Sequence, residues 1–209
     1  MRKGFGICCI VLGICCLAAS VGWIAYNHWE EQNAQDAAKN MLQNVQENIL
    51  DSAQSHGNQS DHGQDQPTES IEEDPLRMPT TEVNGYDCIG VLSIPVLDLE
   101  WPVLTDWSYT KLKMAPCHYF GTYYEPNFVI AAHNYRSHFG RLRRLKPEDL
   151  VLFTDVSGNV YCYEVVLLET LPGDATEEMI TSGFDLSLYT CTLGGGSRIT
   201  VRCNAAASE

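Results

Sequence analysis

Basic residues are scarce in this sequence: 13 Lys and Arg residues stand against 27 Asp and Glu residues, giving a net charge of -14. A protein that binds nucleic acid needs a basic surface for phosphate contacts, so we expect no nucleic-acid partner. The acidity is unevenly placed, because residues 1–29 carry +2, residues 30–83 carry -10 and residues 84–209 carry -6. Most of the negative charge therefore belongs to an intermediate segment.

Residues 84–209 also lack the patterns that hold a metal. There is no dense carboxylate cluster of the kind that binds calcium. Cys117 and His118 are adjacent, but no second pair of ligands follows at zinc-site spacing. We therefore expect no metal and no cofactor.

The nine cysteines do not form an even disulfide framework. Four of them lie in an apolar N-terminal run, and five lie in the C-terminal region: Cys88, Cys117, Cys162, Cys191 and Cys203. Five is an odd number, so at least one thiol there has no partner within the chain. A single disulfide among the four besides Cys191 stays an open alternative to buried, apolar thiols.

Charge is absent from Gly4 to Tyr26, a run of 23 residues that follows Arg2 and Lys3. As a helix this run is about 34 Å long, enough to cross a hydrocarbon core of about 30 Å. A cleaved signal peptide is the alternative, but Ala18-Ala19-Ser20 falls inside the run rather than after it. We predict a single-pass anchor in residues 1–29, with the N-terminus in the cytoplasm and the remainder extracellular.

Three further segments follow the anchor. Residues 30–52 predict an amphipathic helical stalk, either a solvated spacer or a short coiled-coil contact, because small and apolar residues recur every three or four positions: Ala34, Ala38, Met41, Val45 and Ile49. Residues 53–84 are rich in Ser, Gln, Gly and acidic residues and predict a flexible linker. Residues 85–209 predict the folded domain.

The folded domain has few helical patterns and many short apolar runs bounded by turn residues. Only Trp107 to Met114 and Thr176 to Ile180 suggest a turn or two of helix. Seven runs read as strands: 90–94, 99–104, 127–132, 150–153, 160–170, 186–192 and 198–203. This count predicts an all-β barrel or sandwich.

Cys191 is the thiol best placed for chemistry, because it ends one predicted strand and precedes the glycine-rich loop 192–197. Arg198 begins the next strand, so a hairpin would bring it back beside the thiol. His133 ends a third strand. A neighbouring His and Arg favour the reactive thiolate and stabilise an oxyanion. The non-catalytic alternative is that these residues are a structural Cys, a core His and a surface Arg.

These motifs resemble those of the sortases, the membrane-anchored cysteine transpeptidases of Gram-positive surfaces. Their Thr-Leu-x-Thr-Cys hallmark is similar to Ser187-Leu188-Tyr189-Thr190-Cys191, with Ser for the first Thr. Ala132-His133-Asn134 resembles the family's histidine motif, and Ser197 to Arg202 fits its arginine strand. Segments 89–95 and 134–140 are also similar. The resemblance covers roughly Tyr86 to Cys203.

The resemblance implies a closed barrel of about seven to eight strands with Cys191, His133 and Arg198 as catalytic residues. Arg202, on the same strand face as Arg198, is the alternative arginine, and His138 or His118 would be alternative histidines. Thr190, Leu188 and Asn134 are implied to bind substrate. The reaction would cleave an LPxTG-like signal between Thr and Gly through a thioacyl enzyme.

The resemblance also implies partners: surface proteins with C-terminal sorting signals, and an acceptor amine from a peptidoglycan precursor or a pilin lysine. Pilin-polymerising members usually carry a second C-terminal anchor and a lid with Asp-Pro and an aromatic residue. Here no apolar tail follows Cys203, and Asp74-Pro75-Leu76 lacks the aromatic. We expect a non-pilin subclass, with a class B-like member as one option. A non-catalytic, membrane-tethered β-domain that binds peptides or scaffolds surface proteins is the alternative function.

Overall fold

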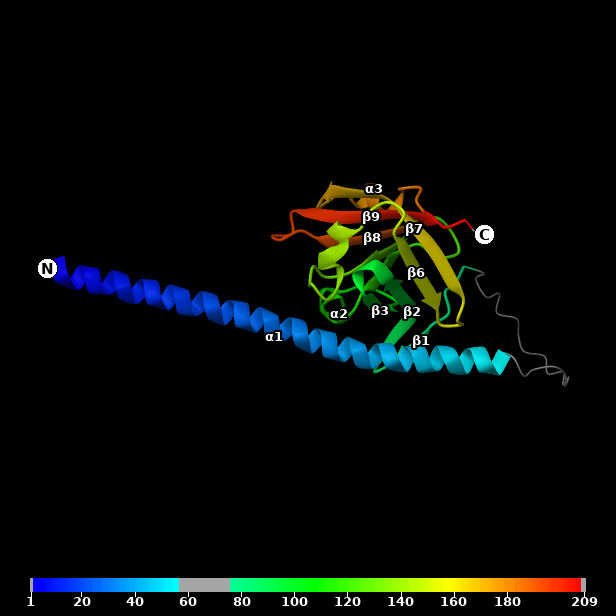
Figure 1. The fold of residues 1–209 in the computed structure, drawn as a ribbon, viewed down its shortest axis with the longest axis horizontal. Coiled ribbons are helices and arrows are strands. Elements are labelled where there is room, and N and C mark those ends of the chain that lie inside the picture. The colour runs from blue at the N-terminus through cyan, green and yellow to red at the C-terminus, as the bar shows by residue number, and fades with distance from the viewer. Residues whose placement is uncertain (1, 57–75, 208–209) are drawn as a thin grey trace.

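The computed structural model describes residues 2–56 and 76–207. Its C-terminal part is a β-barrel, and a long helix runs along one side (Figure 1). Residues 57–75, the middle of the predicted linker with Asp74 and Pro75 of the lid motif, lie outside the described residues. The strands are β1 (Thr81–Val83), β2 (Tyr86–Ile94), β3 (Leu99–Leu104), β4 (Cys117–Phe120), β5 (Phe128–Ala131), β6 (Leu150–Asp155), β7 (Val160–Pro172), β8 (Leu186–Cys191) and β9 (Ser197–Ala205).

Eight strands close the barrel in the order β2-β3-β4-β5-β8-β9-β7-β6, because β6 pairs back with β2. β5 and β8 run parallel, whereas β8 and β9 form an antiparallel hairpin. The expected all-β barrel of seven to eight strands is thereby confirmed. Of the described strands, the sequence missed β1 and β4, both of which are short.

The boundary between linker and domain differs from the prediction. β1 lies within the predicted linker, yet it pairs with β2, with Thr81 opposite Cys88. Val83 is buried in the core. A three-residue strand in a polar stretch gives too little alternation to be recognised, so the folded domain extends at least back to residue 81.

The barrel connections contain the two expected short helices, α2 (Tyr109–Met114) and α3 (Thr176–Ile180). Ser108 caps α2 by accepting a hydrogen bond from the backbone N–H of Lys111 at 3.1 Å. Two 3-10 helices, η1 (Pro95–Leu97) and η2 (Phe139–Arg144), complete the connections. Phe139 and Leu142 anchor η2 because both are fully buried in the barrel core.

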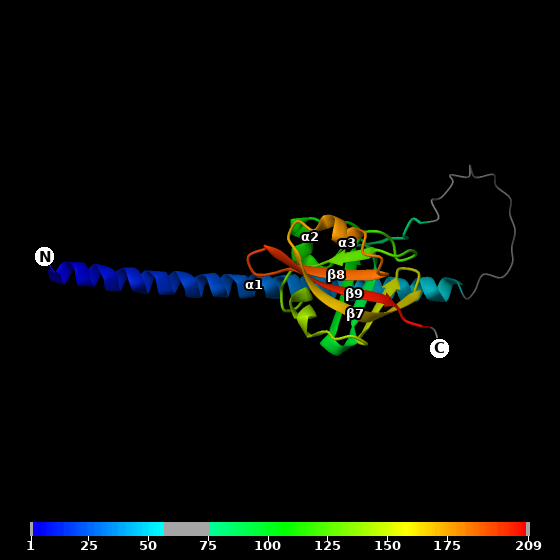
Figure 2. The same cartoon turned by 90° about the horizontal axis from the view of Figure 1, so that it is seen from above.

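The N-terminal helix α1 runs without a break from Arg2 to His56. Within it, Ile10–Glu30 is long and apolar enough to cross a membrane, and none of that stretch is buried inside the structure. The predicted anchor and the predicted stalk are therefore two parts of one helix (Figures 1 and 2).

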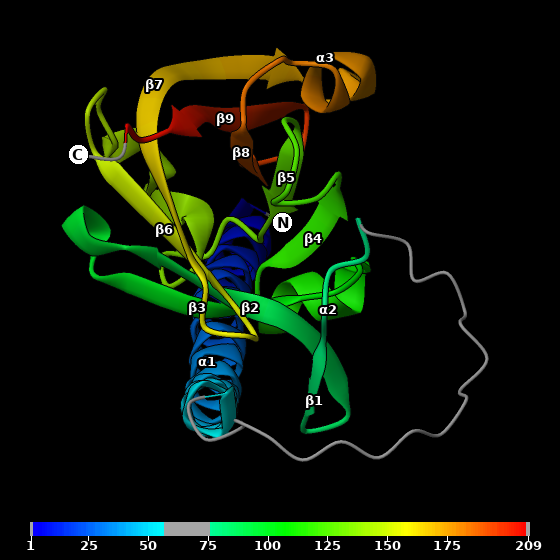
Figure 3. The same ribbon diagram turned by 90° about the vertical axis from the view of Figure 1, so that its right-hand side faces the viewer.

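The stalk part of α1 packs against its own barrel. Ala38, Met41 and Val45 are almost fully buried and belong to the same core cluster as the strands. Seen down the helix, β2 and β3 lie directly over α1 (Figure 3). At the edge of this contact, Gln46 donates a hydrogen bond to Glu100 at 3.0 Å. The stripe is thus an intramolecular docking face rather than a solvated spacer or a coiled-coil seam.

The five cysteines of the barrel are all free. Cys88, Cys117 and Cys203 are fully buried, and burial raises the pKa of each thiol to about 12. These three therefore act as small apolar residues. Cys162 and Cys191 are partly exposed.

Candidate active site

The β8–β9 hairpin brings Cys191 and Arg198 together. The two residues are direct partners in the antiparallel register, where β8 ends and β9 begins. The turn between them is held by hydrogen bonds from Thr192 N to the Ser197 carbonyl and from Gly195 N to the Thr192 carbonyl. Gly194 and Gly195 have φ of 88° and 75°, a left-handed conformation that glycine adopts without strain.

One side of Cys191 opens into a hollow of about 140 Å³ with an aromatic wall, here called the aromatic hollow. Arg198 lies in the same hollow. The rings pack on one another, with Tyr119 5.3 Å from Tyr189 and 5.7 Å from Trp107 between centroids. The wall is therefore a rigid apolar surface beside the thiol, with one guanidinium for polar contacts.

The other side of Cys191 opens into a larger hollow of about 800 Å³, here called the helix-side hollow. His133, Asn134 and Tyr135 line it together with the turn residues that follow Cys191. Its far wall is α1, which contributes Ile24, Asn27, His28 and Glu30. Cys191 thus lies where the two hollows meet.

His133 follows the end of β5 and is held on two sides. The backbone N–H of Asn134 donates to its Nδ1 at 3.2 Å, which leaves Nε2 as the protonated nitrogen of the neutral ring. The Tyr135 ring stacks on it, with centroids 4.4 Å apart and planes 17° apart. Burial lowers the pKa of His133, Lys113 lowers it further, and Glu30 opposes both. The imidazole is consequently mostly neutral at neutral pH.

Sequence reasoning missed three residues around His133. Lys113 of α2 and Glu30 of α1 form an ion pair that lines the helix-side hollow. Tyr135 supplies the stacked ring. Its position two residues after the histidine was a usable signal, whereas Glu30 lies more than 100 residues away in a segment predicted to be a stalk.

Arg202, the alternative arginine, makes contacts that stabilise the fold. Arg202 is 2% exposed, and its guanidinium pairs with Glu169 at 2.7 Å. It also donates to Ser187 and to the Glu178 carbonyl, both at 2.8 Å. Arg202 therefore ties α3 to the hairpin and does not open toward Cys191.

The alternative histidines are also enclosed. His138 is fully buried, packed edge-on against Trp101 with centroids 4.4 Å apart. The ring nitrogens of His118 lie 2.9 and 2.7 Å from the carbonyl oxygens of Thr105 and Gly121. Of the three histidines considered, His133 is the one that lines a hollow with Cys191.

Two of the three residues expected to bind substrate are buried. Leu188 is a fully buried core residue. Thr190 is 2% exposed, and its hydroxyl donates to the Ala132 carbonyl at 2.8 Å. Their side chains pack β8 against β5, and a role of this pair in substrate binding stays a prediction. Asn134 does line the helix-side hollow, and its role as a substrate contact stays a prediction.

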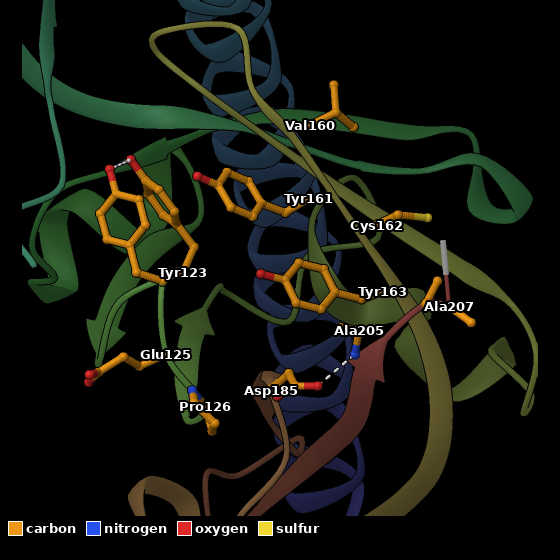
Figure 4. A pocket seen from close by; sticks show the side chains of 12 residues that line it. Tyr123, Glu125, Pro126, Val160, Tyr161, Cys162, Tyr163, Asp185, Ala205 and Ala207 are labelled. Atoms are coloured by element: carbon orange, nitrogen blue, oxygen red, sulfur yellow. Dashed lines mark hydrogen bonds between the residues drawn. The ribbon is translucent and has the colours of Figure 1, made fainter. Parts of the chain in front are cut away.

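Another hollow, of about 420 Å³, lies at the opposite end of β8, beside Asp185 (Figure 4). Tyrosines form its wall, and Tyr161 and Tyr163 point into it. The Asp185 carboxylate accepts a hydrogen bond from Ala205 N at 2.7 Å. None of the catalytic candidates lines this hollow.

Fold and site together define a closed β-barrel with a candidate cysteine acyl-transfer centre. A family model described as "Sortase domain" matches residues 92–206, more than half of the chain. The chain therefore belongs to the sortase family, whose general function is cell-wall transpeptidation. A comparison with curated proteins gives no match.

Solved sortase structures share the fold. Sortase A from Corynebacterium diphtheriae is 23% identical, with a TM-score of 0.52 over 59% of this chain and 63% of that chain. Sortase C1 from Streptococcus suis is 23% identical, with a TM-score of 0.52 over 58% and 74%. Sortase D5 of Clostridium perfringens, described as a transpeptidase, is 16% identical with a TM-score of 0.58 over 82% and 99%. The chain thus spans less than two thirds of the C. diphtheriae protein.

Proposed function

We propose that this protein is a membrane-anchored cysteine transpeptidase that cleaves an LPxTG-like sorting signal between Thr and Gly. The acyl part of the surface protein would pass to an amine of the cell wall or to a pilin lysine. The observation that carries the proposal is the position of Cys191 between two hollows, with Arg198 beside it in one and His133 in the other.

In the first step the Cys191 sulfur attacks the Thr carbonyl carbon, and neutral His133 takes the thiol proton on Nδ1, which releases its hydrogen bond from Asn134 N. Arg198 stabilises the charge that develops on the carbonyl oxygen. The C–N bond then breaks as His133 returns the proton to the leaving amine, which yields a thioacyl enzyme. An incoming amine reverses these steps and regenerates the free thiol.

The two hollows suit the two substrates. The aromatic hollow, with its apolar wall and one guanidinium, fits the apolar and proline-containing segment of a sorting signal. The helix-side hollow contains His133 and Asn134, so the acceptor amine would approach from that side. Each amine would then meet the imidazole that must accept its proton.

The location proposed for this reaction is the outer face of the cell membrane. The candidate span Ile10–Glu30 would hold the chain in the bilayer. Arg2 and Lys3 precede that span, and positive residues favour the cytoplasmic side. The barrel would then lie outside the cell, where sorting signals and cell-wall amines are found.

The test uses the full chain in detergent, because α1 packs on the barrel. Peptides with each sorting-signal position varied are incubated with the protein and an amine, and both cleavage and amide products are measured. A thiol-reactive sorting-signal mimic is added separately, and the modified cysteine is located by mass spectrometry. We expect modification at Cys191 and product formation that Cys191→Ala abolishes.

Cys162→Ala is the matched control, since Cys162 is the other partly exposed thiol of the barrel. It should keep the wild-type rate, whereas His133→Ala and Arg198→Ala should lose both labelling and turnover. Equal labelling of several cysteines, with no peptide cleaved, would instead support the alternative of a non-catalytic domain that binds peptides.

A further inference from the structure

The turn after Cys191 exposes a large apolar side chain to solvent. Leu193 is 93% exposed, the highest value among the exposed large apolar residues of the described chain. The neighbouring Gly194 and Gly195 adopt positive φ, a backbone conformation that glycine takes without strain. Full exposure of a leucine at a loop tip leaves its apolar surface without a partner in this chain.

This turn points along α1 toward the membrane. In two perpendicular views, the β8–β9 turn is the part of the barrel that reaches farthest toward the N-terminal end of the helix (Figures 1 and 2). Leu193 and Ile24 line the same hollow. Ile24 lies inside the candidate span, six residues or about 9 Å before its end at Glu30. The turn therefore reaches the depth of lipid whenever this span occupies a bilayer.

The barrel is fixed in this orientation by two contacts with α1. Met41 and Val45 are buried against the strands, and Glu30 pairs with Lys113 near the hollow. Because α1 is one unbroken helix, the direction of the span also sets the direction of the barrel.

Basic residues at the same end of the barrel suit contact with the phosphate groups of a membrane surface. Five of the nine Lys and Arg residues after Asn84 lie between residues 136 and 146, although residues 84–209 are acidic as a whole. Arg143 is exposed and lines a shallow hollow with Thr192, the first residue of the turn. Glu169 lies in that hollow, but it already pairs with Arg202. Arg136 is exposed and follows Tyr135 of the helix-side hollow.

We propose that the catalytic end of the barrel rests on the membrane surface, with Leu193 inserted among the lipids and Arg136 and Arg143 on anionic phospholipid headgroups. The inference rests on the membrane anchoring proposed above. Exposed Tyr26 and Trp29 at the end of the span mark the same interfacial level, where amphipathic rings gather. Cys191 would then open directly onto the bilayer surface.

Photo-crosslinking tests the insertion. A benzophenone amino acid replaces Leu193 in the full chain, reconstituted in vesicles of phosphatidylcholine with phosphatidylglycerol. The matched control places it at Val160, which is 62% exposed and lines the tyrosine hollow at the other end of the barrel. We expect at least a fivefold excess of lipid adducts at position 193. Equal yields at the two positions, or no adduct at 193, would overturn the proposal.

The same measurement is repeated with Cys191→Ala, because lipid contact needs no catalysis. An adduct at 193 in the protein that retains Cys191, together with no peptide cleavage by that protein, would reject the proposed reaction and support the membrane contact. Peptide cleavage without any lipid adduct at position 193 would support the proposed reaction and reject the membrane contact. The two proposals can therefore fail separately.

A charge reversal tests the headgroup contact. Arg143→Glu should lower the adduct yield at position 193 severalfold on vesicles with phosphatidylglycerol and much less on pure phosphatidylcholine. Arg77→Glu makes the same charge change at an exposed residue outside the basic segment and serves as control. An equal response of the two variants, or no dependence on anionic lipid, would reject the role of Arg143.

Discussion

Cys191 and Arg198 face each other across the β8–β9 ladder, the thiol at the last residue of one strand and the guanidinium at the second of the next. Arg198 Nη1 donates to the Gly195 carbonyl at 3.2 Å, so the turn itself holds the guanidinium of a residue that lines the same hollow as Cys191. Two residues that are seven positions apart in the sequence are therefore direct partners across the hairpin.

Arg198→Ala is expected to lower kcat/KM for a sorting peptide by about 10²- to 10³-fold, the usual loss when one oxyanion donor is removed. The side chain is partly exposed, so the free energy of unfolding should change by only about 0.5 kcal/mol. Steady-state kinetics and thermal unfolding on the same sample separate the two effects. Wild-type activity in Arg198→Ala would exclude the residue from catalysis.

Arg202→Met is expected to show the opposite pattern. It leaves Glu169 without its buried partner and removes the hydrogen bonds that hold α3, so unfolding should become easier by about 3–5 kcal/mol. Denaturant unfolding measures this loss. Glu169→Met with Arg202→Met should recover part of the stability, since both charges are then absent. A stable but inactive Arg202→Met protein would show that Arg202 takes part in catalysis instead.

The sequence was sufficient where the pattern was local. Alternating apolar runs located seven of the barrel strands, and the hairpin logic paired Cys191 with Arg198. The sequence did not predict contacts that depend on long-range packing. The stripe through Met41 and Val45 has helical spacing, but the spacing does not indicate which surface covers it. The burial of Leu188 and Thr190 was not predictable for a related reason, because a motif beside a nucleophile does not distinguish side chains that face a hollow from side chains that support the strand.

Removing either of the two charges near His133 should shift the pH profile of kcat/KM, in opposite directions for the two residues. Lys113 lowers the pKa of His133, so Lys113→Gln should raise that pKa and shift the His133-dependent limb to higher pH. Glu30 raises the pKa, so Glu30→Gln should shift the limb to lower pH. The pH dependence of kcat/KM, or an NMR titration of the ring, reports both.

The control for this pair is Lys111→Gln, which removes a positive charge from the same short helix at a residue paired with Asp106. It should leave the limb in place. Shifts of the same sign in Lys113→Gln and Glu30→Gln would contradict an electrostatic origin.

His138 should make the fold sensitive to acid. Its two ring nitrogens have no hydrogen-bond partner among the described residues, and burial lowers its pKa to about 3. Between pH of about 6.5 and 3 the unfolded chain therefore binds one more proton at this residue than the folded chain does. Stability is complete above pH of about 6.5 and falls as the pH drops, by at most about 1.4 kcal/mol per pH unit.

His138→Phe removes this proton uptake and keeps the ring contacts with Trp101 and Tyr135. The Tm of the full chain, measured by calorimetry from pH 7 downward, should fall less steeply in the variant than in wild type. At pH 7 the variant should be at least as stable, because two unsatisfied buried polar atoms are removed. His118→Phe is the control: it breaks two contacts to carbonyl oxygens and should lower Tm at every pH. Parallel Tm curves for wild type and His138→Phe would show that His138 is protonated in the folded state and that its burial does not control the acid response.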